Sequence, residues 1–202
     1  MNTTSNNIDL NRSRALFQQR RFLNMPLAGT LCWIIIGIGS QFMATEMGKS
    51  LLVFFATGSI VYLAMLLSKI TGEAFFHKEK NPFDTLFLLT VLMAFLVYSI
   101  AIPFFLQDYR SLPMSVGILT GLMWLPFSWI VQHWIGFFHT IARTLLILLA
   151  WFFFPDQSFV IIPAIIVGIY LVSIAVLEQR WRRVQRSAPE ATVFDQQAAG
   201  NE

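Results

Sequence analysis

The chain has 202 residues, of which 56% are hydrophobic and only 12% are charged. Soluble domains carry about 25% charged residues, so this composition excludes an ordinary soluble domain and predicts an integral membrane protein. The formal net charge of +3 does not indicate nucleic-acid binding, because the basic residues are placed as membrane topology requires. The single cysteine, Cys32, excludes an intrachain disulfide and a multi-cysteine metal site.

Residues 1–26 are predicted as a basic segment on the cytoplasmic side of the membrane. Within it, Ile8–Asn24 alternates apolar residues with arginines, a pattern typical of a segment that lies on anionic lipid. The four arginines are Arg12, Arg14, Arg20 and Arg21. The segment is not a signal peptide, since no small-x-small cleavage site follows the first apolar run.

Six apolar segments follow, and each is long enough to cross a bilayer as a helix. The predicted spans are 27–44, 51–68, 85–106, 113–131, 134–154 and 159–177, which form a membrane domain over residues 27–178. The chain must turn near Gln132, because one helix over 113–154 would be about 63 Å long, twice the hydrocarbon thickness. Residues 179–202 are predicted as a cytoplasmic tail that is first basic and then disordered.

The orientation follows from the lysines and arginines outside the spans. With a cytoplasmic N-terminus, eleven of them fall inside and only Lys49 and Arg110 fall outside. This asymmetry predicts an all-α, six-helix membrane bundle with both termini in the cytoplasm.

Three short motifs carry a resemblance to a known family. They are Ser68-Lys69, the NPF of Asn81–Phe83 and the LPFSW of Leu125–Trp129. In this order they resemble a family of small bacterial multi-span membrane proteins of unknown function, over roughly residues 27–177. The resemblance implies a multi-pass protein of the bacterial cytoplasmic (inner) membrane. It supplies no activity, ligand or cofactor, but it suggests that the matching positions matter to the fold or to a shared site.

In the predicted topology these motifs meet at the cytoplasmic membrane surface. The sequence therefore predicts a polar cluster there, made by Lys69, Asn81, Asp84, Ser128 and Trp129. The alternative is that these residues are interfacial anchors and helix caps, since Trp and Lys favour that depth in membrane proteins generally.

The fifth span carries the strongest polar feature at membrane depth. Gln132, His139 and Arg143 share one narrow face of the helix, and Thr140 and Thr144 flank it. A charged residue in the middle of a span is costly to insert, by about 2.5–3.5 kcal/mol on insertion scales, and marks a functional site by default. These five residues are the candidate polar pocket.

The partners of Arg143 are left open by the sequence. No Asp or Glu lies inside a predicted span to pair with it. The partners that remain are hydroxyl groups, backbone carbonyls freed by Pro103 or Pro126, and an anionic ligand or lipid headgroup. The alternative is that the long side chain reaches back to the cytoplasmic surface.

No catalytic motif is found, so no catalytic residue, metal ligand or cofactor is predicted, and the chain is not expected to be an enzyme. Two classes of function remain. One is a small transporter, channel or lipid- or anion-binding protein with a pocket that faces the cytoplasm. The other is an accessory or structural membrane protein that acts through partners. The expected partner in both cases is anionic lipid at the cytoplasmic face, and nucleic acid is not expected.

Overall fold

A computed structural model describes residues 3–73 and 81–199, with the side chains of residues 10–73 and 81–186. Every regular element in this part of the chain is a helix, which confirms the predicted all-α fold. The α-helices are α1 (Thr3–Gln18), α2 (Asn24–Gly39), α3 (Glu46–Gly58), α4 (Ile60–Thr71), α5 (Pro82–Leu96), α6 (Tyr98–Gln107), α7 (Ser111–Gly121), α8 (Trp124–Val131), α9 (Ile135–Phe153) and α10 (Ser158–Ala199). Two short 3-10 helices, η1 (Ser40–Phe42) and η2 (Pro155–Gln157), lie at turns.

Five helices of the described chain are long and apolar enough to cross a membrane. They are Asn24–Phe42, Pro82–Gln107, Ser111–Val131, Ile135–Phe153 and Pro155–Arg186. The number rises to six if α3 and α4, which meet at an angle of 47°, form one bent span. The bend falls at Ser59, whose hydroxyl donates to the carbonyl of Ala56 at 2.8 Å. A hydroxyl that bonds to the preceding turn in this way competes with the helical ladder and favours a bend.

The predicted fourth span is also interrupted, between α7 and α8. Pro126 has no N–H to donate to the carbonyl of Leu122, four residues earlier. That carbonyl instead accepts from the N–H of Leu125 at 3.1 Å, which tightens the turn. The break lies beside α9, which packs against both α7 and α8.

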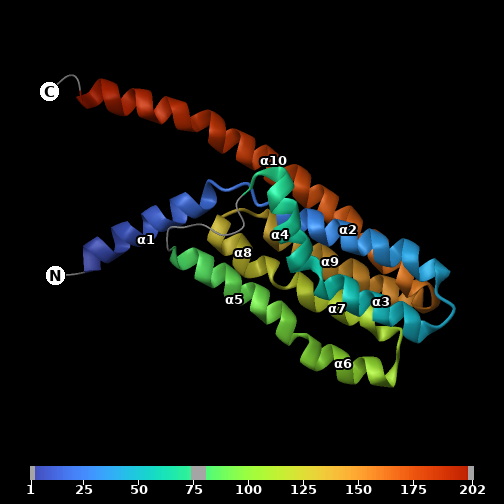
Figure 1. Cartoon of the computed structure of the whole chain (residues 1–202). Coiled ribbons are helices and arrows are strands. Elements are labelled where there is room, and N and C mark those ends of the chain that lie inside the picture. The colour runs from blue at the N-terminus through green and yellow to red at the C-terminus, as the bar shows by residue number, and fades with distance from the viewer. Residues whose placement is uncertain (1–2, 74–80, 200–202) are drawn as a thin grey trace.

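The C-terminal helix differs from its prediction. Instead of a span that ends near residue 177 and a disordered tail, α10 is continuous for 42 residues. At 1.5 Å per residue it is about 63 Å long and extends well past the bundle (Figure 1). Residues 178–186 are mostly Arg and Gln, which are strong helix formers, so nothing there stops the helix.

The helices are arranged around α2, α9 and α10. The most extensive packing in the described chain is between α2 and α10 and between α9 and α10. By contrast, only 17% of the apolar window of the α5–α6 segment is buried, against 39–50% for the other four apolar helices. Figure 1 shows α5 and α6 along one side of the bundle. We call the end of the bundle where α1 and the extension of α10 lie the basic end (Figure 1).

Candidate functional site

Arg143 lies in the interior of the bundle and is only 1% exposed. Its guanidinium donates to three neutral groups: Nη1 to Nε2 of His139 at 3.3 Å, Nη1 to the hydroxyl of Tyr170 at 3.4 Å, and Nη2 to Oγ1 of Thr120 at 3.1 Å. Its Nε has no hydrogen-bond partner in the described chain. Arg143 therefore does not reach back to a membrane surface, and of the partners considered above it uses hydroxyls, together with a histidine.

The hydrogen bonds around His139 fix its tautomer. The hydroxyl of Ser173 donates to the carbonyl of Ile169 at 2.8 Å, so it accepts from Nδ1 of His139 at 2.9 Å. With the proton on Nδ1, Nε2 is free to accept from Arg143, and the imidazole is neutral. The ring of Trp124 stacks on the imidazole, with 3.9 Å between centroids and 10° between planes. The guanidinium is thus held by neutral groups alone.

Glycines make room for these side chains. A Cβ on Gly121 would lie 2.9 Å from Cδ of Arg143, so α7 can approach α9 only because this position is a glycine. A Cβ on Gly29 of α2 would lie 2.7 Å from the hydroxyl of Tyr170. The positions of the two glycines therefore decide where the guanidinium and the phenol meet.

The structure brings together only part of the predicted polar pocket. Thr140 donates to the carbonyl of Gly121 at 3.1 Å, beside Arg143. The hydroxyl of Thr144 is buried and makes no hydrogen bond within the described chain. Gln132 lies elsewhere: it is exposed, ends α8 with a φ of 53°, and accepts from Gln18 at 3.3 Å. It does not share the face of His139 and Arg143 because α9 begins only at Ile135.

Four further residues complete what we call the Arg143 cluster, and the sequence analysis did not find them. The cluster consists of Arg143, His139, Thr120, Trp124, Tyr170 and Ser173. Tyr170 and Ser173 do carry a signal in the sequence. They are three residues apart in an otherwise apolar stretch, so they share a helix face as a pair of polar groups.

At the basic end, the linker between α1 and α2 is held by carboxylates. Arg20 makes a two-pronged ion pair with Asp84 of α5, in which Nη2 and Oδ2 are 2.9 Å apart. Arg21 donates from Nε to Glu178 of α10 at 2.8 Å. Arg20 and Arg21, predicted to contact anionic lipid, thus bind acidic groups of the protein itself. This hydrogen bond with Glu178 raises the pKa of Arg21 above its ordinary value.

A third carboxylate binds the backbone of the same linker. Glu73, just after α4, accepts from the N–H groups of Phe22 and Leu23 at 2.8 and 3.1 Å. These N–H groups lie at the start of α2, where a negative charge is favourable to the helix dipole. Phe22 has a φ of +61°, an uncommon conformation for a bulky residue, and the carboxylate helps to stabilise it. We call Glu73, Asp84 and Glu178 with the linker they hold the collar.

The predicted cytoplasmic-face cluster is spread over this end of the bundle. Asn81 caps α5 by accepting from the N–H of Phe83 at 2.9 Å, and Ser128 donates to the backbone of the turn after α8. Trp129 is exposed and lies 4.5 Å from the guanidinium of Arg14, whereas Lys69 is exposed on α4. Asn81 therefore acts as a cap, which agrees with the alternative interpretation, and Ser128 ties α8 to the turn that follows it.

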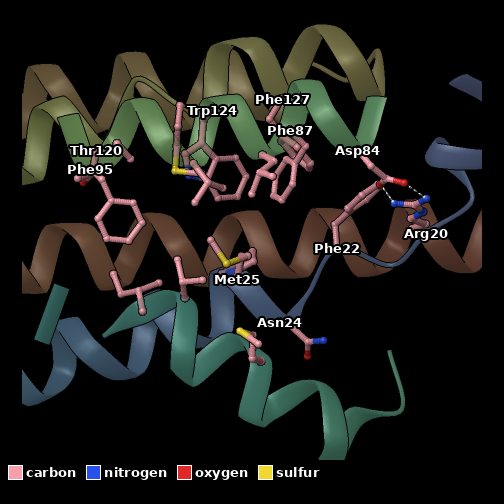
Figure 2. A pocket seen from close by; sticks show the side chains of 18 of the residues that line it. Arg20, Phe22, Asn24, Met25, Asp84, Phe87, Phe95, Thr120, Trp124 and Phe127 are labelled. Carbon is pink, nitrogen blue, oxygen red and sulfur yellow. Dashed lines mark hydrogen bonds and ion pairs between the residues drawn. The ribbon is translucent and has the colours of Figure 1, made fainter. Parts of the chain in front are cut away.

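A cavity of about 390 Å³ lies between α5 on one side and α2 and α4 on the other (Figure 2). This volume is within the range of small-molecule sites, about 300–1,000 Å³. Its walls are mostly apolar and include Met25, Met65, Phe87, Val91, Phe95 and Phe127. One end, at the collar, is lined by Arg20, Asp84, Glu73 and Asn24.

The other end of the cavity reaches the Arg143 cluster. Thr120, Trp124 and Tyr170 all line it, and Figure 2 labels the first two of them. Arg143 does not line the cavity itself but hydrogen-bonds to Thr120 and Tyr170. The wall from Asp84 to Tyr98 is about 21 Å long if it is measured at 1.5 Å per helical residue. The cavity is therefore long, apolar along its sides and polar at both ends, rather than a polar pocket around Arg143.

Among the described residues, no group of three or more His, Cys, Asp or Glu side chains is placed to hold a metal ion. Helices of this length and apolarity are typical of the class of α-helical integral membrane proteins. Within that class the chain belongs to a family of unknown function, DUF7010, whose model matches residues 8–180. Membership of a family without an assigned function was expected from the sequence and is confirmed. Comparisons with curated proteins and with solved structures find no match.

Proposed function

We propose that this protein binds a single-chain amphiphile from the membrane in the cavity between α4 and α5. The observation that carries the proposal is the shape and polarity of the cavity. Its long apolar walls match a hydrocarbon chain. Its polar groups are confined to the two ends, where they can form hydrogen bonds with a polar head group. A bound hydrocarbon chain covers the apolar walls of the cavity. Without it, those walls are open to water at the collar and to lipid between α4 and α5.

The position of α5 gives the ligand a route from the bilayer. The α5–α6 segment is the least buried of the apolar helices, and α5 makes few contacts with α4 across the cavity. Exposed leucines of α5 that do not line the cavity, such as Leu89, Leu92 and Leu96, favour lipid on the outer side of the helix. A chain can therefore enter sideways between α4 and α5 without a passage through the packed interior.

The proposed setting is the cytoplasmic membrane of a bacterium, crossed six times, with both termini and the basic end in the cytoplasm. The support is that α1 and the extension of α10 lie at one end (Figure 1) and that most of the described lysines and arginines outside the predicted spans belong to α1, the linker after it and that extension. On a background without Cys32, a membrane-impermeant maleimide should label Asp156→Cys in intact cells and Arg186→Cys only after permeabilisation. The reverse pattern would show the opposite orientation.

The binding proposal is tested by filling the cavity. Ala94 lines it, so Ala94→Trp places an indole in the path of the chain. Leu92→Trp is the matched control, because Leu92 is on the same helix, is 50% exposed and does not line the cavity. The readouts are the lipids that co-purify, measured by mass spectrometry, and saturable labelling by a photoactivatable analogue of palmitic acid.

Ala94→Trp is expected to lose most of the saturable labelling, and Leu92→Trp to keep it, with both variants folded by thermal unfolding. Equal labelling of the two variants would contradict the proposal. That outcome would favour an accessory or structural protein that acts through partner proteins.

A further inference from the structure

The charge of Arg143 is not balanced within the part of the bundle that the structure describes. Its three hydrogen-bond partners are neutral, and its Nε has none. The ion pairs of the described chain all lie at the collar, on the exposed side of α10 or at the opposite end of the bundle. In an apolar interior, an uncompensated cation attracts any anion that can approach it.

The side chains of Tyr170 and Thr120 separate a ligand in the cavity from this cation. Tyr170 and Thr120 each accept a hydrogen bond from Arg143 and each line the cavity. Thr120 donates its own proton to the carbonyl of Val116 at 2.6 Å. The hydroxyl of Tyr170 donates to no group of the described chain. It is therefore an available donor at the inner end of the cavity, and the guanidinium behind it strengthens it.

The end of the cavity at the collar disfavours an anion, unlike the inner end beside Tyr170. Glu73 and Asp84 place two carboxylates there, and Arg20, the one basic side chain among the described residues that line that end, is already paired with Asp84. A negatively charged head group at the collar would meet these carboxylates. An anion is thus disfavoured at the collar and favoured beside Tyr170.

We infer that the amphiphile is an acid, bound with its anionic head beside Tyr170 and Thr120 and with its hydrocarbon chain toward the opening between α4 and α5. This inference rests on the proposed function and adds the chemical class and the direction of the ligand. Arg143 supplies the charge, Tyr170 the hydrogen bond, and the walls of α4 and α5 the apolar contact. A fatty acid is the simplest molecule with these features.

The test compares an acid with its alcohol on the full-length protein in phosphatidylcholine nanodiscs. Palmitic acid and palmityl alcohol compete with the photoactivatable palmitic acid analogue, at a pH where the free acid is ionised. The variants are Tyr170→Phe, which keeps the ring and removes the donor, and Tyr62→Phe as the matched control. Tyr62 is 73% exposed on α4 and does not line the cavity.

The acid is expected to compete about tenfold better than the alcohol in the wild type and in Tyr62→Phe, as a hydrogen bond to a charged group implies. Tyr170→Phe should remove most of that preference. If Tyr170→Phe is not folded, Thr120→Val provides the second measurement, because it alters the same end of the cavity. Its expected effect is a smaller loss of the preference for the acid.

Three results would overturn the inference in different ways. Equal competition by acid and alcohol in the wild type, with labelling still abolished by Ala94→Trp, leaves an amphiphile site without acid selectivity. An acid preference that survives both Tyr170→Phe and Thr120→Val places the head group elsewhere. If Ala94→Trp does not reduce labelling at all, the labelled site is not the cavity, and the proposed function fails together with the inference.

Discussion

The Arg143 cluster and the collar both hold arginine side chains, but with partners of opposite kinds. In the collar, Arg20 and Arg21 are paired with the carboxylates Asp84 and Glu178 at the water-exposed end of the bundle. In the interior, Arg143 is held by two hydroxyls and a neutral imidazole. The comparison teaches that the depth of an arginine in the bundle decides the chemistry of its partners.

The physical reason is the cost of desolvation. Near water, a carboxylate keeps part of its hydration while it pairs, so adding one costs little. At membrane depth a second charge must also be taken out of water, and the attraction between the two charges repays this cost only if the geometry is excellent. Neutral acceptors avoid that second cost, but they leave the positive charge available to a ligand. We therefore expect the two regions to differ in function as well as in composition.

The largest expected effect comes from Arg143→Lys. A planar guanidinium reaches three acceptors on three helices, and a lysine ammonium cannot reach all of them. We expect the free energy of unfolding to fall by about 2 kcal/mol, roughly the cost of leaving buried polar groups without their partner. Thermal unfolding in detergent measures it, with Arg182→Lys on the exposed side of α10 as control. Equal stability of the two variants would mean that the three hydrogen bonds do not hold Arg143 in place.

A smaller effect is expected at the collar, from Asp84→Asn. The ion pair with Arg20 is partly exposed, so its loss should cost about 1 kcal/mol and should cost less as salt is added. Asp156→Asn is the control, because its pair with Arg110 is more exposed and should matter less. Stability is measured by thermal unfolding at low and high salt. A loss that does not depend on salt would show that Asp84 acts by packing and not by its charge.

The smallest effect concerns pH and His133, in the turn between α8 and α9. Burial lowers the pKa of His133, and the positive charges of Arg180 and Arg183 lower it further. The unfolded chain therefore binds this proton more readily than the folded one. This contribution to stability is complete above the ordinary pKa of about 6.5 and is lost as the pH falls below it. His133→Gln should flatten that part of the thermal-stability profile, and an unchanged profile would assign the pH dependence to other groups.

The sequence by itself determined the class of the fold. Apolar runs of spanning length, the cap at Asn81 and the need to turn near Gln132 are local properties of the chain, read within one helix at a time. The lack of a carboxylate inside any of the predicted spans also follows from the sequence alone. It left hydroxyls, backbone carbonyls, an anion or the membrane surface as the surroundings open to Arg143.

Only the tertiary structure decided which neutral groups these are, and where the cavity lies. Thr120 and Tyr170 are 23 and 27 residues from Arg143, and Arg21 and Glu178 are 157 residues apart. When a helix is apolar on nearly every face, its sequence does not show which face turns toward a neighbouring helix and which toward lipid, because the two surroundings are equally apolar. The rotation of the helix about its own axis is therefore left open. The break before Pro126, the glycines at positions 29 and 121 and the bend at Ser59 fix that rotation, and their effect exists only once the helices pack together.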